Sequence, residues 1–131
     1  MKTKKLKIFI ADSDELCGKI YKEHINRFGY AQVVLFNSLQ ECLNCLKDSP
    51  DIIFLDQKLI EDHGKESIRE TKYRHPGLHI VVFSTNSNMK QVVDAFKQGA
   101  FDYLIRGEKD MQMIDIILRE ISAKVDKAVK S

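Results

Sequence analysis

The sequence predicts an α/β protein with a doubly wound, five-stranded parallel sheet and five covering helices. Its apolar residues alternate between short runs of strand length and stripes at helical spacing, which indicates successive strand–helix units. Successive strand-length runs are separated by segments long enough for a helix, and parallel strands need a crossover of that length. The run at 52–55 is apolar throughout, which is typical of a strand covered on both faces.

The first half of the chain is expected to form three strands and two helices. Apolar runs at 6–11, 31–36 and 51–55 predict the strands. The first helix begins near Asp14 and ends at a glycine suited to a C-terminal cap. The second begins at a Ser-x-x-Glu capping box, starting at Ser38, and stops before a proline. The apolar positions of the first helix are Leu16, Ile20, Ile25 and Phe28.

The second half is expected to form two more strands, at 78–83 and 101–105, and three more helices. The third helix, at about 65–74, is mostly polar, with Ile68 and Tyr73 as its anchors, and it ends before a Pro-Gly pair. The last helix begins near residue 110. Between the two strands, the fourth helix begins at 88 and closes at a glycine, with four side chains expected to point inward, Met89, Val92, Val93 and Phe96.

Length and composition predict one ordinary globular domain over residues 1–131. The core is expected at about 5–122, with 123–131 as a helical extension or a linker. Apolar residues make up 44% of the chain and charged residues 31%. The formal charge of +2 gives no reason to expect nucleic-acid binding, and lysines clustered near the two ends are interpreted as solvated termini.

No apolar run approaches the ~20 residues of a membrane-spanning helix. The basic N-terminus lacks the long apolar stretch of a secretory signal, so a cytoplasmic location is expected and no membrane association. Cys42 and Cys45 form a C-x-x-C pattern, which redox pairs and half zinc sites also show. No second cysteine or histidine pair completes a zinc site, so these cysteines are interpreted as small apolar helix residues.

Four of the predicted strands are followed by a polar residue suited to phosphate chemistry: Asp12, Asp56, Ser84 and Arg106. Parallel strands place their carboxyl ends along one sheet edge, where open α/β sheets hold their sites. The set suits metal-assisted transfer of a phosphoryl group to a carboxylate. Taken singly, Asp12 could cap a helix, and Asp56 and Ser84 could be turn residues. Their ordered occurrence favours a site.

With these residues in place, the chain resembles the receiver domain of two-component response regulators over nearly its whole length. Asp12 matches the first acid of that family and Asp56 the phosphoacceptor. Ser84 matches the switch hydroxyl, and Tyr103 matches the aromatic residue that changes rotamer on phosphorylation. The segment 99–104 is similar to the family's entry into the fifth strand. The resemblance implies a flavodoxin-like sheet with strand order 2-1-3-4-5.

The resemblance also implies the function and the partners. Asp56 would accept a phosphoryl group from a histidine kinase or phosphotransfer protein, assisted by Ser84 and by the cation at 106. Mg²⁺ would be bound by Asp12, Asp56 and the backbone carbonyl of Lys58. The face made by the fourth helix, fifth strand and fifth helix would contact an output partner or effector domain, or form a homodimer. The domain would not be an enzyme beyond slow self-dephosphorylation.

Two departures from the family pattern concern charge. The second acid, usually a metal ligand, is Ser13, which predicts weaker metal binding. The Ser13 hydroxyl could still be a weak ligand, and Asp14 could compensate for the missing charge. Arg106 replaces the family's lysine. Arginine is planar, permanently charged and suited to two-point pairing, so it could bind the phosphoryl group or hold Asp56 in a standing ion pair. His63 is expected near the site, on the loop after Asp56.

Two alternatives are weighed against the phosphorylated switch. The first is a degenerate receiver that acts as a phosphorylation-independent protein-interaction module, for which Ser13 and Arg106 are the motive. The second is a flavodoxin-like mononucleotide enzyme. The acidic loop at 12–15 argues against it, because a phosphate-binding loop there would need neutral donors.

Overall fold

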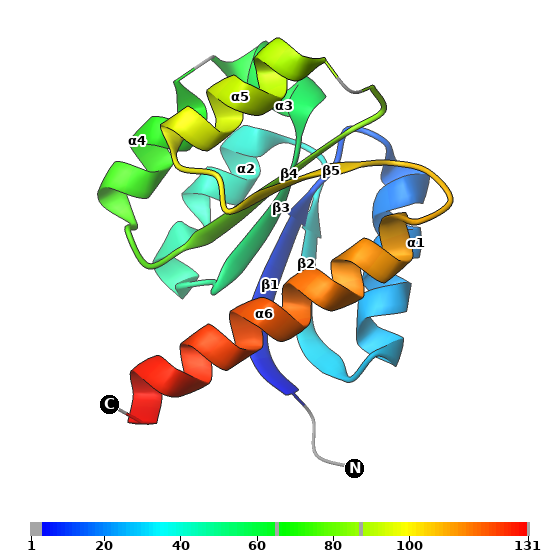
Figure 1. Cartoon of the computed structure of the whole chain (residues 1–131), viewed down its shortest axis with the longest axis vertical. Helices are drawn as coiled ribbons and strands as arrows, with labels where there is room; N and C mark the ends of the chain where they lie inside the picture. The colour runs from blue at the N-terminus through cyan, green and yellow to red at the C-terminus, as the bar shows by residue number, and fades with distance from the viewer. Residues whose placement is uncertain (1–3, 65, 87, 131) are drawn as a thin grey trace.

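The computed structural model describes residues 4–64, 66–86 and 88–130 (Figure 1). Within these residues five parallel strands form one sheet in the order β2-β1-β3-β4-β5, so the predicted fold class and strand order are confirmed. The strands are β1 (Lys4–Ala11), β2 (Tyr30–Phe36), β3 (Ile52–Asp56), β4 (His79–Ser84) and β5 (Asp102–Ile105). Lys65, the predicted start of the third helix, and Ser131, the end of the predicted extension, lie outside the described residues.

Helices cover both faces of the sheet (Figure 1). One face carries α1 (Glu15–Arg27) and α6 (Asp110–Lys130). The other carries α2 (Leu39–Asn44), with a 3₁₀ turn at Leu46–Asp48, and then α3 (Gln57–His63), α4 (Ser67–Arg74) and α5 (Met89–Gln98). The helix α6 crosses the sheet toward the end at which β1 begins, away from the carboxyl ends of the strands (Figure 1). None of the helices described is both long and apolar enough to cross a membrane.

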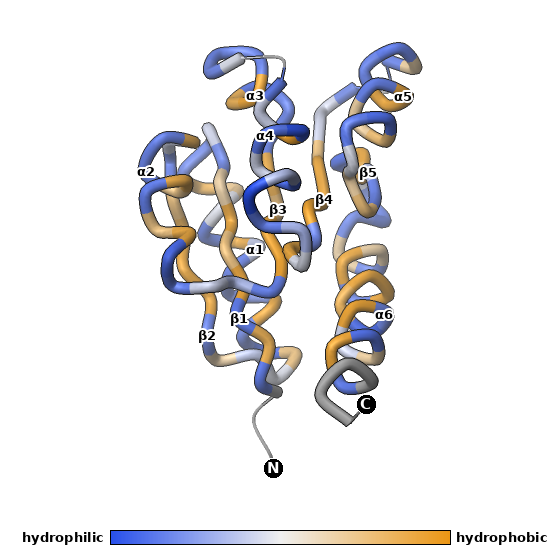
Figure 2. The backbone as a smooth tube through the Cα atoms, turned by 90° about the vertical axis from the view of Figure 1, so that its left-hand side faces the viewer, coloured by the Kyte–Doolittle hydropathy of each residue, from blue (hydrophilic) through white to orange (hydrophobic). Residues whose placement is uncertain are grey.

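The central strands supply two separate apolar cores. Every residue of β3 is buried, and side chains alternate between the two faces of the sheet. Phe54 packs in the core beneath α1 and α6, whereas Ile53 and Leu55 pack in the core beneath the other helices. Figure 2 shows the same pattern as hydrophobic colour along β3 and β4 and as alternating colour along α6. The two cores fix the carboxyl ends of these strands in place.

The predicted helix caps are present in the structure. Asp14 caps α1, with its carboxylate accepting the N–H of Cys17 at 3.1 Å. Ser38 caps α2 through the N–H of Glu41 at 3.1 Å. The residue after α5, Gly99, has a φ of 115°, a left-handed conformation that glycine adopts readily.

One helix differs from the sequence-based prediction. The segment after Asp56, expected to be a loop, forms α3, so the described residues contain six α-helices instead of the five predicted. The carboxylate of Asp56 caps this helix by accepting the N–H of Lys58 at 3.1 Å. Leu59 and Ile60 anchor it in the core, and Gly64 follows its last residue at a φ of 146°.

Several apolar side chains that were expected inside are exposed. Tyr73 on α4 is 89% exposed, and Ile68 alone of the two predicted anchors is buried. On α1, Leu16 and Ile20 face outward. The same holds for three of the four predicted inward residues of α5, which are Met89, Val93 and Phe96. An amphipathic pattern gives the spacing of an apolar face but does not specify whether the sheet or another molecule covers it.

Candidate functional site

The four polar residues predicted at strand ends meet at one edge of the sheet. Asp12 follows β1, Asp56 ends β3, and Ser84 ends β4 beside β5, with Arg106 directly after β5. The N–H of Arg106 donates to the Ser84 carbonyl at 2.8 Å, which extends the pairing of the two strands. Asp12, Asp56 and Ser84 are all buried. The structure therefore brings together the set that the sequence predicted.

Asp56 is held through both of its carboxylate oxygens. Its Oδ2 accepts the backbone N–H of Ser13 at 3.0 Å and also a hydrogen bond from the Ser13 hydroxyl. Its Oδ1 accepts the N–H of Lys58 at 3.1 Å. Ser13, predicted as a possible weak metal ligand, thus donates two hydrogen bonds to Asp56. The side chain of Lys58 is exposed, and so is that of His63 at the far end of α3.

Arg106 forms a two-point ion pair with Asp12. Its Nη2 lies 2.7 Å from Oδ1 of Asp12, and its Nη1 lies 3.1 Å from Oδ2. Its approach to Asp56 is looser, at 3.7 Å between Nη2 and Oδ2. Burial raises the pKa of Asp12, and the hydrogen bonds from Arg106 oppose that rise. Burial lowers the pKa of Arg106, but hydrogen bonding to Asp12 and the electrostatic effects of Asp12, Tyr21 and Asp56 together outweigh burial and raise that pKa.

Asp14 does not enter the site in this arrangement. Its carboxylate caps α1, and its N–H donates to Oδ1 of Asp12 at 2.9 Å. It therefore helps to orient Asp12 through its backbone, while its own charge faces solvent. The sequence-based idea that Asp14 compensates for Ser13 has no support in this geometry.

Ser84 and Tyr103 are neighbours. The hydroxyl of Ser84 accepts the N–H of Asn86 at 3.2 Å, as a turn residue would. Tyr103 on β5 is half-buried and packs against the core beneath α2 to α5. Burial raises the pKa of Tyr103, and a hydrogen bond with Ser84 opposes that rise. The Tyr103 hydroxyl donates to Oε1 of Gln57 at 3.0 Å, so β5 is tied to the first residue of α3.

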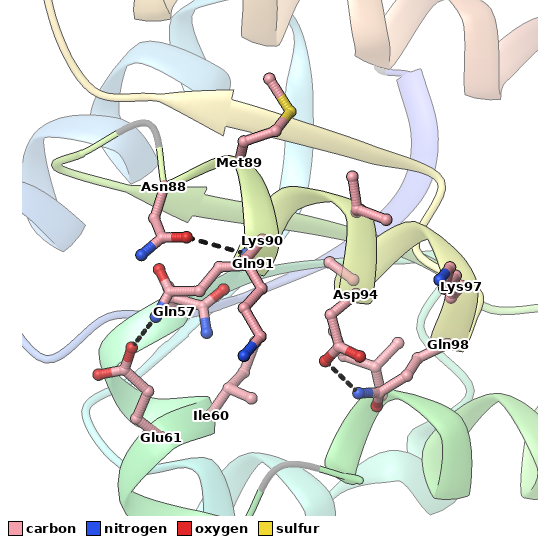
Figure 3. A pocket seen from close by; sticks show the side chains of 13 residues that line it. Gln57, Ile60, Glu61, Asn88, Met89, Lys90, Gln91, Asp94, Lys97 and Gln98 are labelled. Atoms are coloured by element: carbon pink, nitrogen blue, oxygen red, sulfur yellow. Dashed lines mark hydrogen bonds between the residues drawn. The ribbon is translucent and has the colours of Figure 1, made fainter.

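Gln57 also lines a cavity of about 650 Å³ between α3, α4 and α5 (Figure 3). A hydrogen bond between Gln91 and Glu61 joins α5 to α3 at this cavity. Asp56 does not line it. The cavity is thus separate from the acidic edge, and Gln57 is the residue that connects it to Tyr103.

Three residues near the edge were missed at the sequence level: Tyr21, Asp110 and Gln57. The ring of Tyr21 lies beside the Arg106 guanidinium, with 5.3 Å between Cζ and the ring centroid. The Tyr21 hydroxyl donates to Asp110 at the start of α6 at 2.8 Å. Tyr21 and Asp110 lie in helices whose apolar spacing predicts only that they pack on the sheet. The sequence pattern therefore does not indicate that these two residues come close to Arg106.

This edge, with a buried acid after β1, another at the end of β3, a hydroxyl at the end of β4 and a cation after β5, agrees with the comparison to known families. Residues 8–118 match the sequence profile of the response regulator receiver domain. The chain belongs to this family. Receiver domains of this kind are the CheY-like phosphoacceptor signalling domains of two-component systems.

Individual relatives agree with the family assignment. The receiver is 26% identical over 123 residues to the transcriptional regulatory protein ZraR of Klebsiella oxytoca, covering 94% of this chain and 28% of ZraR. It superposes on a CheY-like receiver of Methanospirillum hungatei JF-1 with a TM-score of 0.80, at 19% identity over 93% of this chain and 98% of that one. A Burkholderia pseudomallei response regulator, solved with a phosphorylated aspartic acid and a calcium ion, gives a TM-score of 0.76 at 22% identity, over 94% and 72% of the two chains.

Receiver domains generally bind Mg²⁺ at the acidic site, but the residues of this receiver fit such an ion poorly. Both oxygens of Asp12 are bound by Arg106, and Ser13 is neutral. The carbonyl of Lys58 belongs to the first turn of α3, where carbonyls point along the helix away from its N-terminus. Among the residues described, no cluster of three or more His, Cys, Asp or Glu side chains could hold a metal ion.

Proposed function

We propose that this receiver accepts a phosphoryl group on Asp56 and thereby alters the surface formed by α5, β5 and α6. The observation that carries the proposal is the position of Asp56: a buried carboxylate at the end of the central strand, 3.7 Å from a guanidinium and beside Ser84 on the next strand. A carboxylate held close to a fixed cation is suited to attack a phosphorus atom, because the cation offsets the negative charge of the donor.

The two oxygens of Asp56 have different roles in this proposal. Oδ2 accepts two hydrogen bonds from Ser13, whereas Oδ1 accepts one, from Lys58, among the described contacts. Oδ1 is therefore the nucleophile. It forms the new O–P bond as the P–N bond of a donor phosphohistidine breaks, and the electron pair leaves with the imidazole, which takes up a proton. Ser84 and Arg106 then donate hydrogen bonds to the transferred phosphoryl oxygens.

Mg²⁺ binding is proposed to be weak. Asp12 and Asp56 are oxygen ligands of the kind that Mg²⁺ prefers, and Ser13 contributes a hydroxyl where a second acid would add a charge. When bound, the ion would offset negative charge on the phosphoryl oxygens. In its absence Arg106 is the cation at this edge, within reach of both carboxylates.

The proposed output surface is apolar and exposed. The fourth and fifth helices expected from the sequence correspond to α5 and α6, and the face that they form with β5 carries six large apolar side chains, each at least 40% exposed: Met89, Val93, Phe96, Ile105, Met113 and Ile116. Exposed apolar patches of this kind mark protein contact sites. This face would contact an output partner or effector domain, or a second copy of the receiver.

The contact between Tyr103 and Gln57 supports a connection from the site to that surface. A phosphoryl group that draws the Ser84 hydroxyl away would change the surroundings of the Tyr103 ring, which already lies inward on Gln57. Such a change biases the equilibrium between two arrangements of β5 and α5 by no more than the difference in their affinity for the phosphoryl group.

The remaining assignments follow from the same proposal. A histidine kinase or phosphotransfer protein would supply the phosphoryl group, in the cytoplasm. The receiver would occupy residues 1–131, with a core of about 5–122, and would make no direct nucleic-acid contact. Self-dephosphorylation would be slow, since Arg106 binds both oxygens of Asp12, the other buried carboxylate at this edge, and so opposes its use as a general base.

The degenerate receiver is the second candidate, and the ion pair between Arg106 and Asp12 is the observation that favours it. Beryllofluoride, a phosphoryl mimic, separates the two functions in backbone NMR spectra. The switch predicts shifts at Tyr103 and along α5 in the wild type and none in Asp56→Asn. Shifts confined to the neighbours of Asp56, with Tyr103 and α5 silent, would support the degenerate module instead.

A further inference from the structure

The guanidinium of Arg106 is enclosed on several sides. Its Cζ lies 4.2 Å from the centroid of the Phe83 ring and 5.3 Å from that of Tyr21, and the two rings meet edge to face at 5.8 Å. Only 13% of the Arg106 side chain is exposed. Aromatic rings attract a cation through their electron-rich faces, and arginine uses this contact more often than lysine. The rings therefore form a slot that suits an arginine.

The slot is fixed by a second layer of contacts. The hydroxyl of Tyr21 donates to Oδ2 of Asp110 at 2.8 Å, and the N–H of Gly107 approaches the same oxygen at 3.4 Å. Asp110 therefore joins the loop that follows Arg106 to α1. Tyr21 is buried, so its hydroxyl has little access to water as an alternative partner. Residues of α1 and β4 thus pack against the guanidinium of Arg106, and a residue at the start of α6 holds the tyrosine of α1 in place.

The enclosed Arg106 limits the binding of a second cation, such as a metal ion, to Asp12. Arg106 already covers both oxygens of a carboxylate that is fully buried. A divalent ion that bound Asp12 would either displace the guanidinium from its slot or lie beside it, and two cations in contact repel strongly in a buried setting. Displacement would also leave the guanidinium without its partner, which is costly for a charge that is mostly buried.

We infer that Arg106 is a built-in cation that takes the place of the divalent metal ion at this site, and that Tyr21 and Asp110 are positioning residues that hold it there. The inference rests on the proposed function and concerns the regulation of the same site. It implies that phosphoryl uptake by Asp56 depends little on Mg²⁺, in contrast to receivers with a full acidic pair. An ion pair that only stabilises the fold would instead leave phosphoryl uptake dependent on Mg²⁺.

Calorimetric titration of Mg²⁺ into the full chain distinguishes these possibilities. Arg106→Met keeps an unbranched side chain but removes the charge, and it should tighten Mg²⁺ binding by about tenfold or more, because one adjacent cation is lost. Tyr21→Phe keeps the ring and removes only the contact to Asp110, so it should tighten binding by about threefold as the slot loosens. Tyr73→Phe removes the hydroxyl of an exposed tyrosine and should match the wild type.

Mg²⁺ affinity in Arg106→Met that equals or falls below that of the wild type would overturn the inference. If Arg106→Met does not fold, Tyr21→Phe decides, and an unchanged affinity there has the same meaning.

A second measurement compares labelling of the wild type by acetyl phosphate, in which the P–O bond to acetate breaks, with Mg²⁺ and with excess chelator. Similar extents of labelling support the inference, and labelling only with Mg²⁺ contradicts it. Absence of labelling under both conditions would instead refute the proposed function, while the titrations would still test the role of Arg106.

Discussion

Arg106 pairs with Asp12 more closely than with Asp56: its guanidinium nitrogens lie 2.7 and 3.1 Å from Asp12 and 3.7 Å from Asp56. The sequence left open whether this arginine binds the phosphoryl group or locks the phosphoacceptor in an ion pair. The geometry favours a third arrangement, in which Asp12 holds the arginine and Asp56 keeps one lightly bonded oxygen. Arg106 therefore offsets one of the two carboxylate charges at this edge and leaves Oδ1 of Asp56 outside the ion pair.

Restoring the second acid should strengthen metal binding. Ser13→Asp adds a charge next to Asp12 and Asp56, so Mg²⁺ affinity measured by calorimetry should rise, by about tenfold. Asp14→Asn is the matched control, because asparagine also caps helices and Asp14 faces solvent. It should leave the affinity as in the wild type. A clear loss of affinity in Asp14→Asn, with none gained in Ser13→Asp, would place the metal ligand at Asp14.

Breaking the contact between Tyr103 and Gln57 should uncouple the output surface from the acidic edge. Gln57→Leu removes the acceptor of the Tyr103 hydroxyl but keeps a side chain of similar size in α3. With beryllofluoride bound, NMR shifts near Asp56 should persist while those along α5 shrink. Gln40→Leu, at an exposed position of α2, controls for the loss of a glutamine. Equal α5 responses in Gln57→Leu and the wild type would show that another contact carries the coupling.

The C-x-x-C pattern should show no redox chemistry. Burial raises the pKa of the Cys42 thiol to about 12, and thiolate is the reactive form of cysteine. Iodoacetamide at mildly alkaline pH should therefore label Cys17 and Cys45, which are half-buried, well before Cys42. Peptide mass mapping over time gives the order. Rapid labelling of Cys42, or a disulfide between Cys42 and Cys45 under mild oxidation, would contradict the packing role predicted for them.

His79 should make the fold less stable in mild acid. Burial lowers the pKa of His79 below its usual value of 6.5, since its ring packs against Phe101, and the bond to the Asp51 carbonyl only partly opposes this. As pH falls below about 6.5, the unfolded chain binds a proton that the folded chain does not, so the free energy of unfolding decreases. His79→Asn should flatten this part of the profile in urea denaturation, while His63→Asn, at an exposed site, should not. An equal slope in all three proteins would show that other groups cause the acid sensitivity.

The residues at the strand ends were predictable for two reasons. Short apolar runs identify the strands in the sequence, and a parallel sheet places the carboxyl ends of its strands along one edge. A run such as 52–55 is typical of a strand in the middle of a parallel sheet, and parallel order then places Asp12, Asp56, Ser84 and Arg106 along one edge. The partners within that set were not predictable. Whether Arg106 pairs with Asp12 or with Asp56 depends on its rotamer, which its contacts with Phe83 on β4 and Tyr21 on α1 help to fix. The spacing of residues in the sequence does not indicate either contact.

The helix α3 was missed for a related reason. Its seven residues are too few to show helical periodicity, and the residue that caps it, Asp56, was already assigned to the site. The outward apolar residues of α5, such as Val93 and Phe96, were expected in the core because periodicity shows that a helix is amphipathic without showing what covers it.

The most direct test of the account is intact-mass measurement after incubation with acetyl phosphate or phosphoramidate. The account predicts one added phosphoryl group on the wild type and on Asp62→Asn, which removes an exposed carboxylate from the same helix α3. Asp56→Asn should show no added mass, because asparagine cannot form the acyl phosphate. An unchanged mass increase in Asp56→Asn would contradict the assignment of Asp56 as the phosphoacceptor, and no increase in any of the three proteins would favour the degenerate receiver.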